Sequence, residues 1–132
     1  EGKLKNNDVH LTIHGDQDVE IWGYKNEFAQ VLLNIILNAI DTMAERETAS
    51  PRIHINLTEE NAWAILVIQD NGGGIESSLL DKIFEPYFTT RKKGTGIGLY
   101  IAKTIIENNM DGRLTVENTE EGAKFTIAVC CS

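Results

Sequence analysis

The chain has 132 residues, a length that suits one domain with a single hydrophobic core. Hydrophobic residues make up 42% of the chain, which argues against a disordered protein. The formal net charge of −8 argues against a basic face for duplex nucleic acid, so we predict no nucleic-acid partner.

No apolar run reaches the ~18 residues of a membrane span, and no signal peptide is visible. The two cysteines, Cys130 and Cys131, are adjacent and have no other cysteine to pair with. A reducing compartment therefore fits best. We predict a cytoplasmic domain and leave open whether its parent chain is anchored in a membrane.

Two strands and a long helix are expected in the first third of the chain. Alternating apolar residues in Val9–Ile13 and Val19–Trp22 predict two strands joined as a hairpin. A helix is expected from near Tyr24–Asn26 to about Arg46. Its apolar residues cover more than a narrow stripe, which indicates a largely buried helix.

Three polar residues interrupt the apolar pattern of this helix. Asn34, Asn38 and Asp41 stand at i, i+4 and i+7, so they share one face. A buried amide without a hydrogen-bond partner costs about 1–3 kcal/mol. A wet cleft, a ligand or an ion would therefore suit this face; a satisfied core network or an exposed stripe is the alternative.

The middle of the chain predicts two strands and a polar turn. Ile53–Leu57 and Ala62–Ile68 are the strands, and the second should be buried on much of both faces. It leads into Asp70–Ile75, where an acid is followed by three glycines. The Asp70 carboxylate can only accept hydrogen bonds, so it could meet a ligand amine, a cation or backbone N–H groups. An ordinary Asp-Asn-Gly turn is the alternative.

A glycine-rich segment, Gly94–Leu99, follows the densest basic cluster, Arg91–Lys93. Alternating glycines let a backbone wrap a ligand, and the N-terminus of the following helix favours an anion. We interpret the segment as a phosphate clamp; a flexible hairpin tip before a surface helix is the alternative. That helix should reach about Asn109 and stop at Gly112.

The remaining elements are a short helix over Ser77–Phe84, with its leucines and Ile83 inward, and a final hairpin of Leu114–Asn118 and Lys124–Val129. The mixed order of strands and helices predicts an α/β two-layer sandwich with helices on one face of the sheet. Residues 1–7 should be a linker and residues 8–132 the single domain.

Four segments stand in a familiar order along the chain: Asn34–Ala39, Asp70–Ile75, Ile83–Phe88 and Gly94–Leu99. In these segments the chain resembles the catalytic ATP-binding domain of sensor histidine kinases, in the Bergerat-type ATPase superfamily. Ala39–Met43 is similar to the nitrogen-regulator-type subgroup. The resemblance covers nearly the whole chain and implies a mostly antiparallel sheet of about five strands packed against three helices.

The resemblance implies that the domain binds ATP and Mg²⁺. Asn38 would bind Mg²⁺ through its side-chain oxygen, and Asp70 would accept a hydrogen bond from the adenine amino group. Gly72 and Gly74 would let the backbone lie against the base. The further nucleotide-binding residues that it implies are Asn34, Asp41, Thr42, Ile75, Thr90, Arg91, Lys92, Lys93, Gly94, Thr95, Gly96, Ile97, Gly98, Leu99 and Thr126. Asn34 and Asn38 would be the catalytic pair, and Phe84, Pro86 and Phe88 would anchor a mobile lid.

Three positions depart from the pattern of the superfamily. Relatives that hydrolyse ATP, such as gyrase, carry a glutamate at the position of Asn34, where it acts as a base toward water. An amide cannot take a proton at neutral pH, so efficient hydrolysis is not expected. Asp41 replaces a lysine common in histidine kinases, and Thr42 replaces an aromatic residue that stacks on adenine.

We therefore expect transfer of the γ-phosphate to a histidine on a separate helical dimerisation domain, with a response regulator downstream. None of His10, His14 and His54 is followed by an acid, as the family's acceptor histidine is. The fragment should be a monomer that binds nucleotide without labelling itself, and its parent a homodimer. A nucleotide-regulated interaction module and an ATP hydrolase of the gyrase or chaperone kind are the alternatives.

Overall fold

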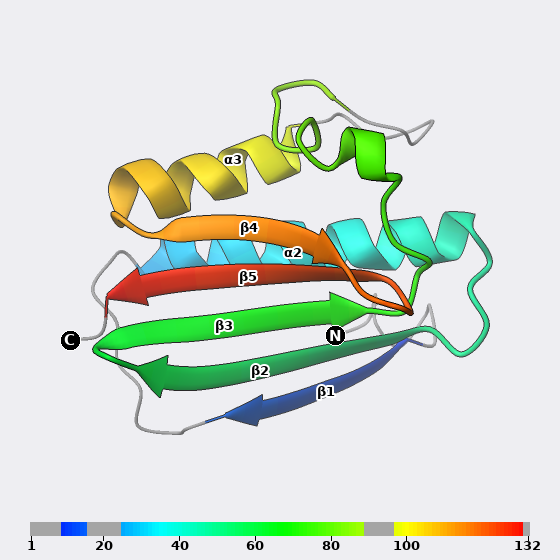
Figure 1. Cartoon of the computed structure of the whole chain (residues 1–132), viewed down its shortest axis with the longest axis horizontal. Helices are drawn as coiled ribbons and strands as arrows, with labels where there is room; N and C mark the ends of the chain where they lie inside the picture. The colour runs from blue at the N-terminus through cyan, green and yellow to red at the C-terminus, as the bar shows by residue number, and fades with distance from the viewer. Residues whose placement is uncertain (1–8, 16–24, 89–96, 131–132) are drawn as a thin grey trace.

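The computed structural model describes residues 9–15, 25–88 and 97–130. Five strands of these ranges form one sheet in the order β1-β2-β3-β5-β4 (Figure 1). Their bounds are β1 His10–Gly15, β2 Arg52–Glu60, β3 Trp63–Asp70, β4 Arg113–Asn118 and β5 Ala123–Cys130. Only β1 and β2 pair in parallel, which confirms the mixed, mostly antiparallel sheet. The expected strand Val19–Trp22 lies outside the described residues.

The helices pack on one side of this sheet. In Figure 1, α2 (Lys25–Glu45) runs behind the strands and α3 (Gly98–Thr104) lies beside the β4 edge. A single π-helical turn, η2 (Ile105–Asn109), continues α3, and η1 (Ser77–Leu79) is one short 3₁₀ turn. Within the described ranges, no helix is both long and apolar enough to cross a membrane.

The hydrophobic core fills the space between α2, α3 and one face of the sheet. Along β3, Ala64, Leu66 and Ile68 are buried, whereas Ile65 and Val67, which alternate with them, are only half-buried. The apolar run predicts burial of this strand on much of both faces. Only the residues on the face that the helices cover are fully buried. Asp70 follows Ile68 by two residues, so its side chain emerges on the helix side, at the rim of the core.

The helix expected over Ser77–Phe84 is shorter than its apolar spacing indicates. Only η1 forms, and it is followed by turns in which Lys82 N–H donates to the Leu79 carbonyl and Glu85 N–H to the Lys82 carbonyl. These i to i−3 bonds close single turns and do not propagate an α-helix. Leu79 and Ile83 still turn inward and are half-buried.

The end of α3 also differs in detail from the expected glycine stop. The residue with left-handed φ is Asp111 (φ 51°), and η2 ends at Asn109, with Met110 N–H still donating to the Ile105 carbonyl at 3.2 Å. Gly112 lies against the backbone carbonyl of Ala128, where a Cβ atom would collide. Gly112 is therefore required for close contact with β5, and Asp111 makes the turn.

Core packing on α2 gives the first prediction. Ile35 is fully buried, whereas Leu33 on the same helix is 49% exposed. Ile35→Ala should lower the free energy of unfolding by about 2–5 kcal/mol, because it removes buried methyl groups and leaves a cavity. Urea unfolding measures this, and Leu33→Ala is the matched control, with an expected loss below about 1 kcal/mol. Equal losses in both variants would contradict the packing.

Candidate functional site

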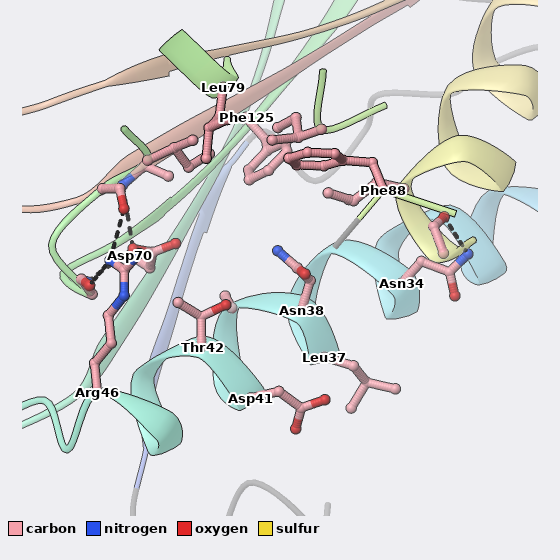
Figure 2. Close-up of a pocket in the computed structure, with 18 of the residues that line it drawn as sticks. Asn34, Leu37, Asn38, Asp41, Thr42, Arg46, Asp70, Leu79, Phe88 and Phe125 are labelled. Atoms are coloured by element: carbon pink, nitrogen blue, oxygen red, sulfur yellow. Dashed lines mark hydrogen bonds between the residues drawn. The ribbon is translucent and has the colours of Figure 1, made fainter. Parts of the chain in front are cut away.

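A cavity of about 400 Å³ opens between α2, the end of β3, the loop that follows it and the start of α3 (Figure 2). It brings together segments that are far apart in sequence. Of the residues expected at a nucleotide site, those that line it are Asn34, Asn38, Asp41, Thr42, Asp70, Gly72, Gly74, Ile75, Gly98 and Leu99.

Other expected residues are not in this lining. Thr126 lies on β5 between the buried Phe125 and Ile127, so it points to the opposite face of the sheet. Ile97, next to α3, is described but is not part of the lining. Thr90, Arg91, Lys92, Lys93, Gly94, Thr95 and Gly96 lie outside the described residues.

Asp70 is held at one end of the cavity by backbone donors. Its Oδ1 atom accepts hydrogen bonds from Gly72 N–H at 2.9 Å and Ala123 N–H at 3.3 Å. Both bonds use the same oxygen, so among the described residues Oδ2 keeps its capacity to accept a hydrogen bond from a ligand. Such a carboxylate can accept a hydrogen bond from an amine in the cavity, but while ionised it has no proton to donate.

The electrostatic environment of Asp70 is a balance of opposing effects. Burial raises the pKa of the Asp70 carboxyl above its ordinary value, because desolvation disfavours the charged form. The hydrogen bonds from Gly72 and Ala123 and the positive charge of Arg46 act in the opposite direction. A titratable group whose pKa is perturbed inside a cavity is typical of functional sites.

Arg46 is a lining residue that the sequence analysis did not identify as part of the site. It follows α2 directly, and Figure 2 shows its guanidinium beside Asp70. Its Nη1 atom donates to the carbonyls of Gly72 at 2.6 Å and Gly74 at 2.7 Å. In sequence an arginine at a helix C-terminus indicates only an interaction with the helix dipole, and no local pattern marks a contact with a loop 26 residues away.

The polar residues of α2 line the cavity from Thr42, near Asp70, past Asn38 to Asn34 at the other end. Figure 2 shows the Asn38 amide and the Thr42 hydroxyl directed into it and Asp41 at its edge. Asn34 is engaged within the protein: its Nδ2 donates to the Gly98 carbonyl at 3.0 Å, and its Oδ1 accepts from Gln30 Nε2 at 2.7 Å. Asn34 therefore ties α2 to the first residue of α3.

The wall opposite α2 is apolar. Phe125, Phe88, Leu79 and Ile83 line it. Phe84 packs edge-on against Phe125, with ring centroids 6.2 Å apart. The two-residue period of β5 could have identified Phe125, since it shares the inward face with Ile127, and Thr126 does not.

This donor set also limits how a metal ion could bind. Among the described residues, no group of three or more His, Cys, Asp or Glu side chains could hold a metal ion. A cation near Asn38 would need oxygen ligands from a bound molecule and from water. Mg²⁺ bound together with phosphate groups behaves in this way.

Comparison with known families places the chain in a clear context. The family model for histidine kinase-, DNA gyrase B- and HSP90-like ATPases matches residues 23–131. The two-component sensor PprA of Pseudomonas aeruginosa is 40% identical over 116 residues, which make up 84% of this chain and 12% of PprA. The chain thus spans a small part of that relative.

Solved structures give the same picture. A nucleotide-free catalytic domain of the histidine kinase ThkA matches with a TM-score of 0.87 at 28% identity, covering 98% of this chain and 83% of that one. A structure of ThkA in complex with the response regulator protein TrrA matches with a TM-score of 0.83 at 25% identity, covering 99% and 36%. The sheet and helices described above are therefore a known architecture.

The balance at Asp70 predicts a specific dependence of stability on pH. Because the folded protein holds the Asp70 proton to higher pH than the unfolded chain does, the contribution of Asp70 to stability falls as pH rises above its ordinary pKa of 3.8. Asp70→Asn keeps an oxygen that can accept from Gly72 and Ala123 and removes the desolvated charge.

We therefore expect Asp70→Asn to have a higher free energy of unfolding than the wild type at pH 7, with the difference shrinking as pH falls toward 3.8 and levelling off below it. Urea unfolding across this range measures it, and Asp81→Asn at an exposed position is the control. A variant that is less stable than the wild type at pH 7 would show that the charge is fully compensated.

Proposed function

The chain belongs to the family of histidine kinase-, DNA gyrase B- and HSP90-like ATPases, and from this premise we propose that it is the catalytic ATP-binding domain, residues 8–132, of a sensor histidine kinase. The domain would bind Mg-ATP and donate the γ-phosphate to a histidine. The observation that carries the proposal is the cavity, which has the half-buried carboxylate of Asp70 at one end and, toward the other, the amide of Asn38 and then Asn34. The likeness to the two-component sensor PprA supports it.

The end of the cavity at Asp70 suits adenine. Oδ2 of Asp70 would accept a hydrogen bond from the exocyclic amine, while Gly72 and Gly74 bring backbone close to the ring. Phe125 and Ile83 offer apolar surface to its faces. Guanine carries a carbonyl where adenine has its amine, so two acceptors would face each other there.

The end of the cavity at Asn38 suits the metal and the phosphates. Asn38 would give its side-chain oxygen to Mg²⁺, with the other ligands from phosphate oxygens and water. Bound Mg²⁺ would neutralise charge on the phosphates. The backbone N–H groups at the start of α3, beside Gly98 and Leu99, face the same end and suit an anion.

The transfer needs an acceptor from outside the described fold. A histidine nitrogen would form a bond to the γ-phosphorus as the bond to the β-phosphate oxygen breaks, and ADP would leave with that electron pair. A helical dimerisation domain of a homodimeric parent would supply this histidine, and a response regulator would take the phosphoryl group next. The ThkA structure with TrrA supports the second partner. The nitrogen-regulator-type subgroup and a cytoplasmic location stay predictions from the sequence.

Phosphotransfer tests the proposal directly. We expect the isolated domain to bind labelled ATP without becoming labelled, and a chain that joins it to a helical domain with an acceptor histidine to gain acid-labile phosphate. Replacing that histidine by alanine is the control. Stable label on the isolated domain, or steady phosphate release without transfer, would refute the kinase assignment.

Asn38→Ala tests the metal end separately. We expect the gain in ATP affinity on adding Mg²⁺ to fall by about 1–3 kcal/mol, since one ligand to the cation is lost, while affinity without Mg²⁺ changes little. Calorimetric titration with Mg²⁺ and with a chelator measures both values. Asn108→Ala, at an exposed asparagine of η2, is the matched control. The same Mg²⁺ gain in both variants would remove Asn38 from the metal site.

A further inference from the structure

We propose that Arg46 and Asn118 are positioning residues that hold the loop Gly72–Ile75 from its two sides and thereby set the selectivity of the pocket for adenine. This inference rests on the proposed function, because it concerns the loop next to Asp70. Neither residue needs to touch the nucleotide. Arg46 comes from the end of α2, and Asn118 comes from the end of β4, so the two sides are fixed by different parts of the fold.

Arg46 holds the loop through its carbonyl groups. One guanidinium nitrogen, Nη1, donates to both Gly72 and Gly74, at 2.6 and 2.7 Å (Figure 2). Two short bonds from a charged donor fix the distance between these carbonyls. Arg46 follows a helix whose core residues are buried, so its backbone is a firm base for the contact.

Asn118 holds the other side of the loop through both backbone polar groups of one residue, Ile75. Its Oδ1 accepts from Ile75 N–H at 2.8 Å, and its Nδ2 donates to the Ile75 carbonyl at 2.6 Å. The side-chain amide thus pairs with the backbone as a neighbouring strand would. A third bond, from Gly73 N–H to the Glu121 carbonyl at 2.9 Å, joins the loop to the β4–β5 turn.

The loop requires such support because of its own sequence. Gly73 and Gly74 have φ values of 93° and 82°, which residues other than glycine rarely adopt. Consecutive glycines lose much conformational entropy when they are ordered. Without the contacts from both sides, the Gly72 N–H that orients Asp70 would have no fixed position.

Arg46 also provides charge, which Asn118 does not. The charged lining residues among those described are Asp41 of α2, Asp70, Glu76 after the loop and Arg46. From the hairpin side, Asp70 meets the Ala123 N–H, and the nearest turn carries Glu121, which pairs with Arg52 at 3.1 Å. Arg46 is thus the cation of the described lining, and its charge lowers the pKa of the Asp70 carboxyl.

These roles predict different effects for the two substitutions. Arg46→Met and Asn118→Ala should each weaken the binding of ATP and of ADP by the same factor, about threefold to tenfold. Each should also lower the preference for ATP over GTP. In Arg46→Met the loss of ATP affinity on acidification should begin at higher pH than in the wild type. Arg46→Lys keeps the charge and Asn118→Ala leaves it untouched, so both should keep the wild-type pH profile.

Calorimetric titration with ATP, ADP and GTP from pH 8 down to the ordinary Asp70 pKa of 3.8 measures these effects. Arg113→Met and Asn108→Ala, at exposed positions away from the loop, are the matched controls. In nucleotide-free protein, the backbone amides of Gly73 and Ile75 should exchange with deuterium faster in Arg46→Met and in Asn118→Ala than in the controls.

The outcomes separate the two claims. A wild-type domain without preference for ATP over GTP would overturn the proposed function and the selectivity role together. If the wild type prefers ATP over GTP but Arg46→Met and Asn118→Ala behave like the control variants, the positioning role of Arg46 and Asn118 alone would be overturned. Weakening of ATP but not of ADP would also overturn it, because Arg46 would then act on the γ-phosphate.

Discussion

The carboxylate of Asp70, half-buried where β3 ends, is the constraint on which the site depends. The strand that brings Ile68 into the core carries Asp70 to the same face two residues later, so the fold cannot form without desolvating this group. Hydrogen bonds from Gly72 and Ala123 and the charge of Arg46 offset part of the penalty, and the pKa of Asp70 stays raised. The ionised carboxylate, whose Oδ2 can accept from a ligand, therefore lowers the stability of the folded protein, as polar groups at binding sites commonly do.

The charged residues of the described lining are mostly acidic. Asp41, Asp70 and Glu76 give this lining a negative excess that Arg46 only partly offsets. A nucleotide triphosphate adds several negative charges, which this lining alone would repel. Binding of the phosphates therefore needs cations that arrive with the ligand, such as Mg²⁺, or that come from the basic cluster Arg91–Lys93, which lies outside the described residues. At the end near Asp70, by contrast, backbone N–H groups of Gly72 and Ala123 orient the carboxylate.

Local patterns in the sequence predicted the parts of this structure that depend on local physics. The spacing of apolar residues gave α2 to within a residue of each end, and an acid after a buried strand marked Asp70. Contacts between distant segments were not predictable in this way. Asn118 looked like an ordinary residue at the end of a strand, and its pairing with Ile75 depends on how the last hairpin packs against the loop. The family resemblance implies Thr126 as a site residue. The two-residue period of β5 instead puts Phe125 on the inward face and Thr126 on the opposite one.

Asn34 shows how one contact can bear on the choice between phosphoryl transfer and hydrolysis. Its amide donates to the Gly98 carbonyl, and this bond sets the start of α3 against α2 at the phosphate end of the cavity. An ionised glutamate at that position could activate water, but it would bring a second acceptor to the same carbonyl and lose the bond. The contact that aligns α2 with α3 and a general base for hydrolysis therefore exclude one another at this position. Under the proposed function, the amide of Asn34 would keep α2 aligned with α3 and would leave ATP intact for an acceptor histidine.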